Sequence, residues 1–223
     1  MLNNIGWRAA FYLIAVLIIV VTFVVLKLID EPEKELILPG TPMTRCSNTI
    51  YLCTFILGMV GEGVRTMSPL YMAELQIGNE SIGIILAAMT VASLFILPFA
   101  GWLADKVGRK KPIIYGFLFS APIISSFSLV TNYYEFAFVL GLLGAVIGLS
   151  FPAASAYAQD SSSKVRAAAM GIYHTSRVAG MTVSPVLGGM IADRIGIGAA
   201  FNIYAFAALI GALITYTLLK ENK

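Results

Sequence analysis

Residues 101–111 read Gly-Trp-Leu-Ala-Asp-Lys-Val-Gly-Arg-Lys-Lys, a short charged segment between two long apolar ones. No charged residue occurs in 81–100 before it or in 112–132 after it. Twenty residues of α-helix, at about 1.5 Å of rise each, cross the roughly 30 Å hydrocarbon core of a bilayer. The segment therefore predicts a turn between two membrane-spanning helices, in which Gly101 and Gly108 allow close packing and a sharp backbone.

The composition indicates an integral membrane protein with several spans. Of the 223 residues, 58% are hydrophobic and only 12% are charged, about half the charged share of soluble proteins. Mean hydropathy is +0.85. The net charge of +3 comes from dispersed cations, so the expected surroundings are the lipid bilayer and not nucleic acid. With one histidine and two cysteines, we expect no metal site and no cofactor.

The apolar segments predict seven helices, and so an all-α membrane protein. The expected ranges are 8–28, 48–76, 81–103, 112–131, 135–158, 166–191 and 199–219. The one long polar connection carries four acidic residues and three prolines, and we interpret it as a linker. No nucleophile motif and no phosphate-binding loop accompany these helices, so an enzyme is not expected.

Lysines and arginines predict the orientation in a cell membrane. If the 101–111 turn is cytoplasmic, eleven of the 15 cations fall on that side, only Arg8 and Arg194 fall outside, and two lie inside spans. Cytoplasmic loops carry the excess of Lys and Arg. The C-terminus is therefore expected in the cytoplasm, and 131–135 and 192–198 are expected to face outward.

The charged turn resembles motif A of the major facilitator superfamily, written roughly G-x-L-a-D-r-x-G-r-k. The matching residues are Gly101, Leu103, Ala104, Asp105, Gly108, Arg109 and Lys110. The resemblance implies transport between two six-helix halves. It also implies a gating role for this turn, in which Asp105 interacts with Arg109 or with a helix N-terminus. An ordinary positively charged loop is the alternative interpretation.

An internal repeat explains the odd number of helices. Ile5-Gly6-x-x-Ala9-Ala10-Phe11 recurs 190 residues later, in 195–201. Within the resemblance, 1–29 is then the last helix of an N-terminal half, 30–46 is a cytoplasmic linker, and 47–223 is the C-terminal six-helix half. A missing or separately encoded N-terminal half is an expected partner.

The sixth span resembles motif C of drug:proton antiporters, G-x-x-x-G-P-x-x-G-G, with a serine in place of one glycine. The residues concerned are Gly180, Ser184, Pro185, Gly188 and Gly189. Small residues four apart share one helix face, and a proline bends the span. We expect these residues to act in helix packing or as a hinge.

Charges inside the spans mark the candidate substrate and proton pathway. Glu62 and Arg65 lie three residues apart in one span, and His174 and Arg177 have the same spacing in another. A charge at the bilayer centre costs at least about 2.5–3.5 kcal/mol, so it faces protein or a watery cavity. Either Glu62 exchanges a proton while the arginines bind an anionic substrate, or Glu62 and Arg65 form a structural ion pair. Three residues with flexible or aromatic side chains that suit an apolar substrate complete the candidates: Met59, Tyr71 and Tyr173.

The expected function is therefore secondary transport of a small molecule by alternating access. The resemblance implies an antiporter that is proton-coupled and active in drug or metabolite efflux. The alternative is a membrane protein that does not transport: a partner subunit, a sensor, or an inactive truncated remnant of such a transporter.

Overall fold

The computed structural model describes residues 16, 19–20, 45–160 and 166–219. The chain divides into two units, Met1–Pro39 and Gly40–Lys223. In the first unit the described residues, Val16, Ile19 and Val20, are helical. Most of the expected helix over 8–28 and of the linker over 30–46 lies outside the described residues. The following description concerns the second unit.

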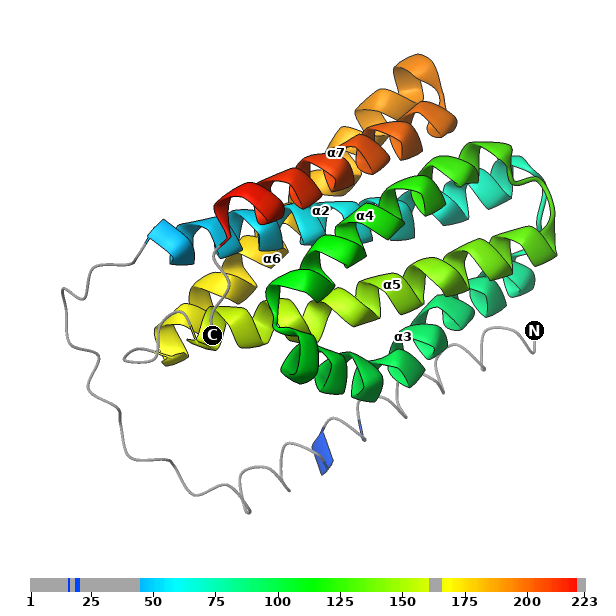
Figure 1. The fold of residues 1–223 in the computed structure, drawn as a ribbon. Coiled ribbons are helices and arrows are strands. Elements are labelled where there is room, and N and C mark those ends of the chain that lie inside the picture. Colours follow the sequence, from blue (N-terminus) through cyan, green and yellow to red (C-terminus); the bar gives the residue numbers. More distant parts are fainter. Residues whose placement is uncertain (1–15, 17–18, 21–44, 161–165, 220–223) are drawn as a thin grey trace. The chain divides into compact units, whose positions relative to one another are not determined.

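The described part of the second unit is helical, without strands, as the sequence predicts (Figure 1). Six α-helices follow one another, and a short 3-10 helix, η1 (Phe127–Leu129), extends the third of them. The α-helices are α2 (Arg45–Glu74), α3 (Asn79–Val107), α4 (Lys110–Ser126), α5 (Tyr133–Asp160), α6 (Arg166–Ile195) and α7 (Ile197–Leu218).

Five of these helices are long and apolar enough to cross a membrane, namely α2, α3, α4 extended by η1, α5 and α7. Helix α6 is as long as α2 but is not among the five. It contains His174, Arg177, Asp193 and Arg194 together with many small polar residues. The described residues therefore confirm a multi-span helical protein, but not the count of seven spans.

Two helices, α3 and α6, run about one turn further at their C-terminal ends than the sequence predicts, and the turns after them are shorter. Helix α3 continues through Asp105 to Val107, and α6 continues to Ile195. The chain reverses at Gly108, with φ of +88°, and at Gly196, with φ of +100°. Residues with a Cβ rarely adopt such angles, so these two glycines fix the turns. The prediction that Asp105 lies beyond the end of its helix is wrong, because Gly101 sits inside regular helix and does not interrupt it.

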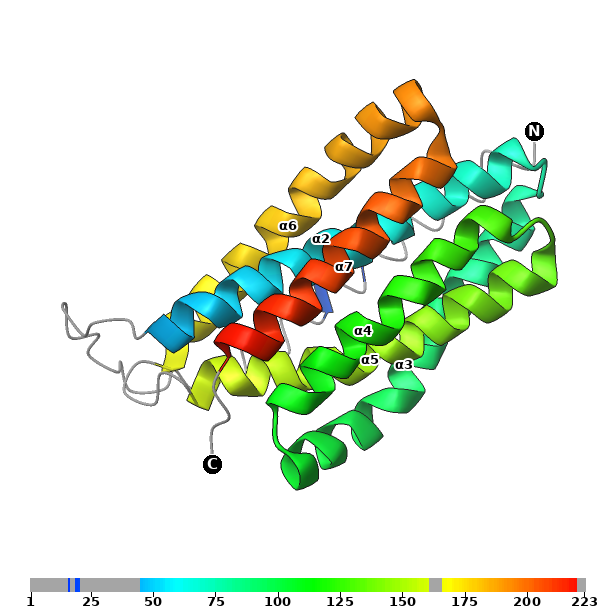
Figure 2. The same cartoon turned by 45° about the horizontal axis from the view of Figure 1, so that its top comes forward.

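The helices pack most closely in three pairs, α3 with α5, α2 with α6, and α4 with α7 (Figure 2). Glycines allow each close approach. A Cβ on Gly144 of α5 would collide with the Met89 backbone of α3, and a Cβ on Gly148 would collide with the Ile96 side chain and lie tightly against the Ser93 backbone. A Cβ on Gly211 of α7 would reach the ring of Phe117 on α4. Small residues let membrane helices approach in this way, so Gly144 and Gly148 form a packing face of α5.

An aromatic cluster closes the core at the end of the bundle where α4 leads through η1 into α5. Phe127 and Phe201 stack with ring centroids 4.9 Å apart, and Phe136 lies 6.2 Å from Phe127. Tyr71 meets Phe136 and Phe201 edge to face, at 5.7 and 5.9 Å. Aromatic pairs at these separations add stability beyond their buried area. The cluster fixes this end of α2, α5 and α7.

Candidate functional site

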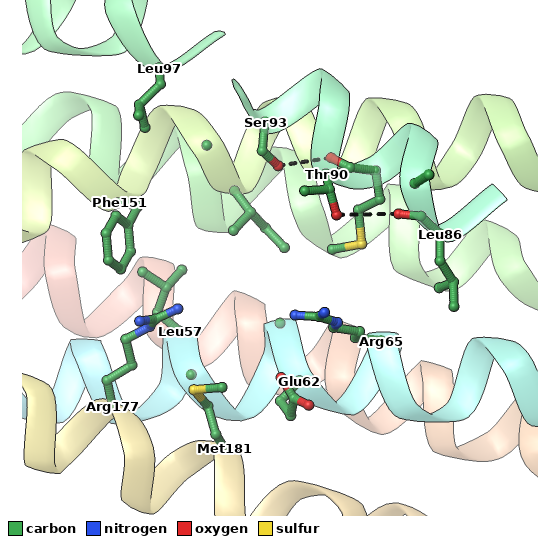
Figure 3. A pocket seen from close by; sticks show the side chains of 16 residues that line it. Leu57, Glu62, Arg65, Leu86, Thr90, Ser93, Leu97, Phe151, Arg177 and Met181 are labelled. Carbon is green, nitrogen blue, oxygen red and sulfur yellow. Dashed lines mark hydrogen bonds between the residues drawn. The ribbon is translucent and has the colours of Figure 1, made fainter. Parts of the chain in front are cut away.

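A cavity of about 500 Å³ lies between α2, α3, α5 and α6 (Figure 3). Its wall is mainly apolar and includes three charged side chains. The lining residues are Leu57, Gly58, Gly61, Glu62, Arg65, Leu86, Ala87, Met89, Thr90, Ser93, Leu97, Ile147, Gly148, Phe151, Arg177 and Met181. Volume and lining are those of a small-molecule site.

Helical spacing brings these residues to one wall from each helix. On α2 the lining positions follow one another at intervals of one, three, one and three from Leu57 to Arg65. On α3 the intervals from Leu86 to Leu97 are one, two, one, three and four, and Arg177 and Met181 on α6 are four apart. Residues three and four apart share a helix face. Each helix therefore presents one continuous stripe to the cavity.

The charged residues of the wall are Glu62 and Arg65 from α2 and Arg177 from α6. Glu62 and Arg177 are half-buried, and Arg65 is exposed in the cavity. Figure 3 shows the Arg65 side chain directed towards α3 and the Arg177 side chain directed towards Phe151. Glu62 and Arg65 do not form the ion pair that their spacing allows: in the described ranges the ion pair is between Arg109 and Asp160.

Arg177 is held from two sides. Its guanidinium carbon lies 4.5 Å from the centroid of the Phe151 ring on α5, a cation–π contact. Its backbone carbonyl approaches Gly58 on α2 so closely that a Cβ there would collide with it. Tyr173, one turn before Arg177 on α6, meets the same Phe151 ring edge to face, with ring centroids 6.3 Å apart. The α2–α6 contact and the aromatic pair together place the guanidinium at the cavity wall.

The other predicted pathway residues lie outside the cavity lining. His174 is exposed and lines a separate shallow groove on α6 with Val178 and Thr182. Tyr71 belongs to the aromatic cluster at the end of the bundle. Met59 packs against the core. Tyr173 is fully buried, and its hydroxyl has no hydrogen-bond partner in the part of the chain that the structure describes.

The segment that resembles motif C ties three helices together. The Ser184 hydroxyl of α6 donates to the Met59 carbonyl of α2 at 2.6 Å, and the Tyr204 hydroxyl of α7 donates to the Ser184 carbonyl at 2.6 Å. Gly180 faces the Phe55 carbonyl of α2, where a Cβ would collide. Gly188 makes a similarly close approach to Tyr204, whereas Gly189 faces open space and Pro185 is half-buried. Ser184 thus supplies an interhelical hydrogen bond that a glycine would lack.

The segment that resembles motif A ties α4 to the ends of two other helices. Arg109 pairs with Asp160 and donates to the Ala156 carbonyl at 2.7 Å, both near the end of α5. Lys110 donates to the Tyr216 carbonyl of α7 at 2.9 Å. Asp105 is exposed on the last turn of α3, and its neighbour Lys106 lies 4.8 Å from the Trp102 ring. The predicted Asp105–Arg109 interaction is replaced by the pair between Arg109 and Asp160.

Sequence reasoning missed the contributions of α3 and α5 to the cavity. Phe151, whose ring makes the cation–π contact with Arg177, is one of 13 phenylalanines. No charge or motif distinguishes it in the sequence. The sequence does contain one signal for the part of α3 that lines the cavity. Two hydroxyl residues, Thr90 and Ser93, lie three apart in an otherwise apolar span, and both are in the lining. Both hydroxyls bond to carbonyls, and Ser93 reaches Gly144 of α5 at 2.8 Å.

Comparison with known proteins gives the class to which this bundle belongs. The model of the Major Facilitator Superfamily matches residues 50–223, which include all the helices α3–α7 and most of α2. The chain therefore belongs to this superfamily of membrane transporters, as motif A suggested. It is a multi-pass membrane protein.

Relatives with curated names are multidrug resistance proteins. The chain is 32% identical over 175 residues to "Multidrug resistance protein 2" of Bacillus subtilis (strain 168), a match that covers 78% of this chain and 44% of the relative. It is 28% identical over 177 residues to "Multidrug resistance protein MdtG" of Salmonella choleraesuis, covering 77% and 44%. The matched region thus spans less than half the length of these relatives.

Proposed function

We propose that this chain supplies one half of a secondary transporter that moves a small molecule by alternating access. The observation that carries the proposal is the cavity between α2, α3, α5 and α6, with Glu62, Arg65 and Arg177 on its wall. Ionisable groups at membrane depth are costly and mark pathways for substrates and ions. The other wall of the substrate site belongs to a further six-helix half, whether on the same polypeptide or separately encoded.

Glu62 is the proposed carrier of a coupling proton. It is the one acidic residue in the cavity lining, and the titratable groups that share this lining with it are Arg65 and Arg177. Desolvation favours a protonated carboxyl group, and a nearby guanidinium favours the carboxylate. Substrate that engages the arginines weakens their hold on the carboxylate and so favours proton uptake by Glu62, which links proton binding to substrate binding. The names of the relatives favour efflux, and the proposed cycle couples export of the substrate to proton movement.

The proposed orientation has the α3–α4 turn and the C-terminus in the cytoplasm. On that side the contacts of Arg109 and Lys110 join α4 to α5 and α7, and the exposed Asp105 is free to meet another half of the transporter. We propose that this face closes when the cavity opens outward. Labelling of a cysteine at position 111 by a membrane-impermeant reagent, from each side in turn, tests the orientation: labelling only from outside contradicts it.

The test of coupling is the Glu62→Gln variant, co-expressed with a six-helix N-terminal half and reconstituted in vesicles. Glutamine mimics the permanently protonated state. A panel of anionic, cationic and neutral aromatic compounds is applied, and a pH-sensitive dye inside the vesicles records proton movement. Compound-driven proton movement should be lost, while exchange of compound across the membrane at equal pH should persist.

The matched control is Glu74→Gln, an exposed carboxylate at the end of the same helix, which should couple normally. Arg65→Gln removes the neighbouring cation and separates coupling from structural roles. Undiminished proton movement in the Glu62→Gln, Arg65→Gln double variant would remove Glu62 from the mechanism.

A further inference from the structure

The cavity has an excess of positive charge. Among its lining residues, two arginines face one carboxylate. In the described ranges, neither Arg65 nor Arg177 makes a hydrogen bond or an ion pair, and the ion pair found there, Arg109–Asp160, lies outside the cavity lining. Arg177 is half-buried, and an unpaired cation partly removed from water is costly, so the site gains stability when an anion enters. The wall is therefore complementary to negative charge.

We propose that the cavity binds small amphipathic organic anions, with Arg177 and Arg65 contacting the acidic group and the apolar wall covering the hydrophobic body. The proposal names the substrate class of the proposed transporter and rests on that function. It commits to one ligand chemistry: an acidic group such as a carboxylate, sulfonate or phosphonate attached to an apolar skeleton of a size that suits a cavity of about 500 Å³.

Arg177 is prepared for anion binding by its contact with Phe151. The aromatic ring holds the guanidinium carbon at 4.5 Å, and among the described residues no hydrogen bond uses the N–H groups of Arg177. These donors lie in the guanidinium plane and match the two oxygens of an acidic group. Phe151 is in turn packed against the buried ring of Tyr173. A cation that is already oriented loses little conformational entropy when it binds.

Arg65 supplies the second cation from α2, on the same side of the cavity as Arg177 and further along that side (Figure 3). The two hydroxyl groups of the cavity lining, Thr90 and Ser93 on α3, already bond to backbone carbonyls. Thr90 donates to Leu86, and Ser93 is within reach of two carbonyls. The guanidinium groups are thus the free hydrogen-bond donors among the polar side chains of the lining.

The remainder of the wall suits an apolar body. Leucines from α2 and α3, Ile147 of α5 and Met181 of α6 surround the space between the charged groups. Burial of such a body contributes roughly 25 cal/mol for each Å² of apolar surface removed from water. A cationic compound would have Glu62 as its one partner and would be repelled by two arginines. The sign of the ligand charge is therefore the property to test.

The test compares three probes that share one naphthalene ring system: 1-naphthalenesulfonate, 1-naphthalenemethanol and 1-naphthylmethylammonium. Binding to the full chain in nanodiscs of zwitterionic lipid is measured by titration calorimetry, with empty nanodiscs as the blank. We expect the sulfonate to bind at least about tenfold more tightly than the ammonium probe, since each charge-assisted hydrogen bond contributes on that scale. Equal or tighter binding of the ammonium probe would overturn the proposal.

Variants assign the effect to the two arginines. Arg177→Gln and Arg65→Gln should each weaken sulfonate binding about tenfold while changing binding of the neutral alcohol less than about twofold. Arg194→Gln is the matched control, because Arg194 is an exposed arginine on α6 outside the cavity lining. Arg65 is exposed, so its variant keeps the fold even if loss of Arg177 unfolds the chain. Unchanged sulfonate affinity in the Arg65→Gln variant or in the double variant would refute the assignment.

The binding experiment needs no gradient, so its failure is distinct from failure of the proposed function. A chain that binds the sulfonate through these arginines, but moves no compound when paired with an N-terminal half, contradicts transport alone. A chain that transports but prefers the ammonium probe, in a manner that depends on Glu62, contradicts the anion proposal alone.

Discussion

Tyr173 is a residue whose polar group has no function in the packing of the described helices. The ring is fully buried against Phe151, while the hydroxyl has no hydrogen-bond partner among the residues that the structure describes. A buried hydroxyl without a partner costs about 1–3 kcal/mol. We expect Tyr173→Phe to keep the ring contact and to leave the free energy of unfolding unchanged or raise it by about 1 kcal/mol. Unfolding in mild detergent, followed by circular dichroism, measures the change.

Tyr204→Phe provides the comparison, because the Tyr204 hydroxyl donates to the Ser184 carbonyl at 2.6 Å. Its loss should lower the free energy of unfolding by about 1 kcal/mol. If the two variants destabilise the protein equally, the Tyr173 hydroxyl has a partner after all, and the Arg177–Phe151–Tyr173 arrangement needs revision.

At the same scale, the sequence identified the charged part of the candidate site and not its apolar part. Glu62, Arg65 and Arg177 stand out because charges are rare in spans, and all three line the cavity. Tyr71 is nine residues from Glu62, or two and a half turns of about 3.6 residues, and therefore lies on the opposite side of α2. Phe151 could not be singled out, because an aromatic ring in an apolar helix is as compatible with lipid as with a site.

At the scale of the element, the contact between α2 and α6 depends on glycines at the crossing. Gly180 approaches the Phe55 carbonyl and Gly58 approaches the Arg177 carbonyl, each without room for a Cβ. Backbone atoms cannot move aside as flexible side chains can. We expect Gly180→Ala to lower the free energy of unfolding by about 1–3 kcal/mol, the usual cost of overpacking.

Gly189→Ala is the matched control for this prediction. Gly189 lies nine residues further along α6 and has no atom within 4 Å of the position a Cβ would take. Alanine there should keep or slightly raise stability, because it favours helix. Equal effects at both positions would show that helix propensity, and not the crossing, determines the result.

The sequence predicted the existence of the elements better than their ends. Each of the six expected helices over 48–219 is present. The ends of α3 and α6 were placed too early because the polar residues there were assigned to loops, whereas helices continue beyond the apolar core of a membrane as long as their residues tolerate helical backbone. The structure ends them instead at Gly108 and just before Gly196, where φ turns positive.

At the scale of the whole chain, the helical membrane class follows from composition, but the pairing of helices does not. Apolar side chains face lipid and protein alike, so mean hydropathy does not reveal which face is covered. The helices differ greatly in how much of their apolar segment is buried inside the protein: 61% for α2, against 11% for α3. The cavity is defined by this pairing, since its four helices come together as α2 with α6 and α3 with α5. For that reason the sequence supplied candidate residues without their arrangement.

The single residue between α6 and α7 has a consequence for biosynthesis. Helix α6 contains Arg177 near its middle and, among α2–α7, is the helix that is not counted as long and apolar enough to cross a membrane. One residue later the ribosome delivers α7, which is long and apolar enough to cross a membrane. We expect the two to leave the translocation channel together as a hairpin. Glycosylation mapping in microsomes compares the chain ended at Ile195 with the chain ended at Leu218: α6 should insert poorly in the first, and equal insertion in both would show that α6 needs no companion.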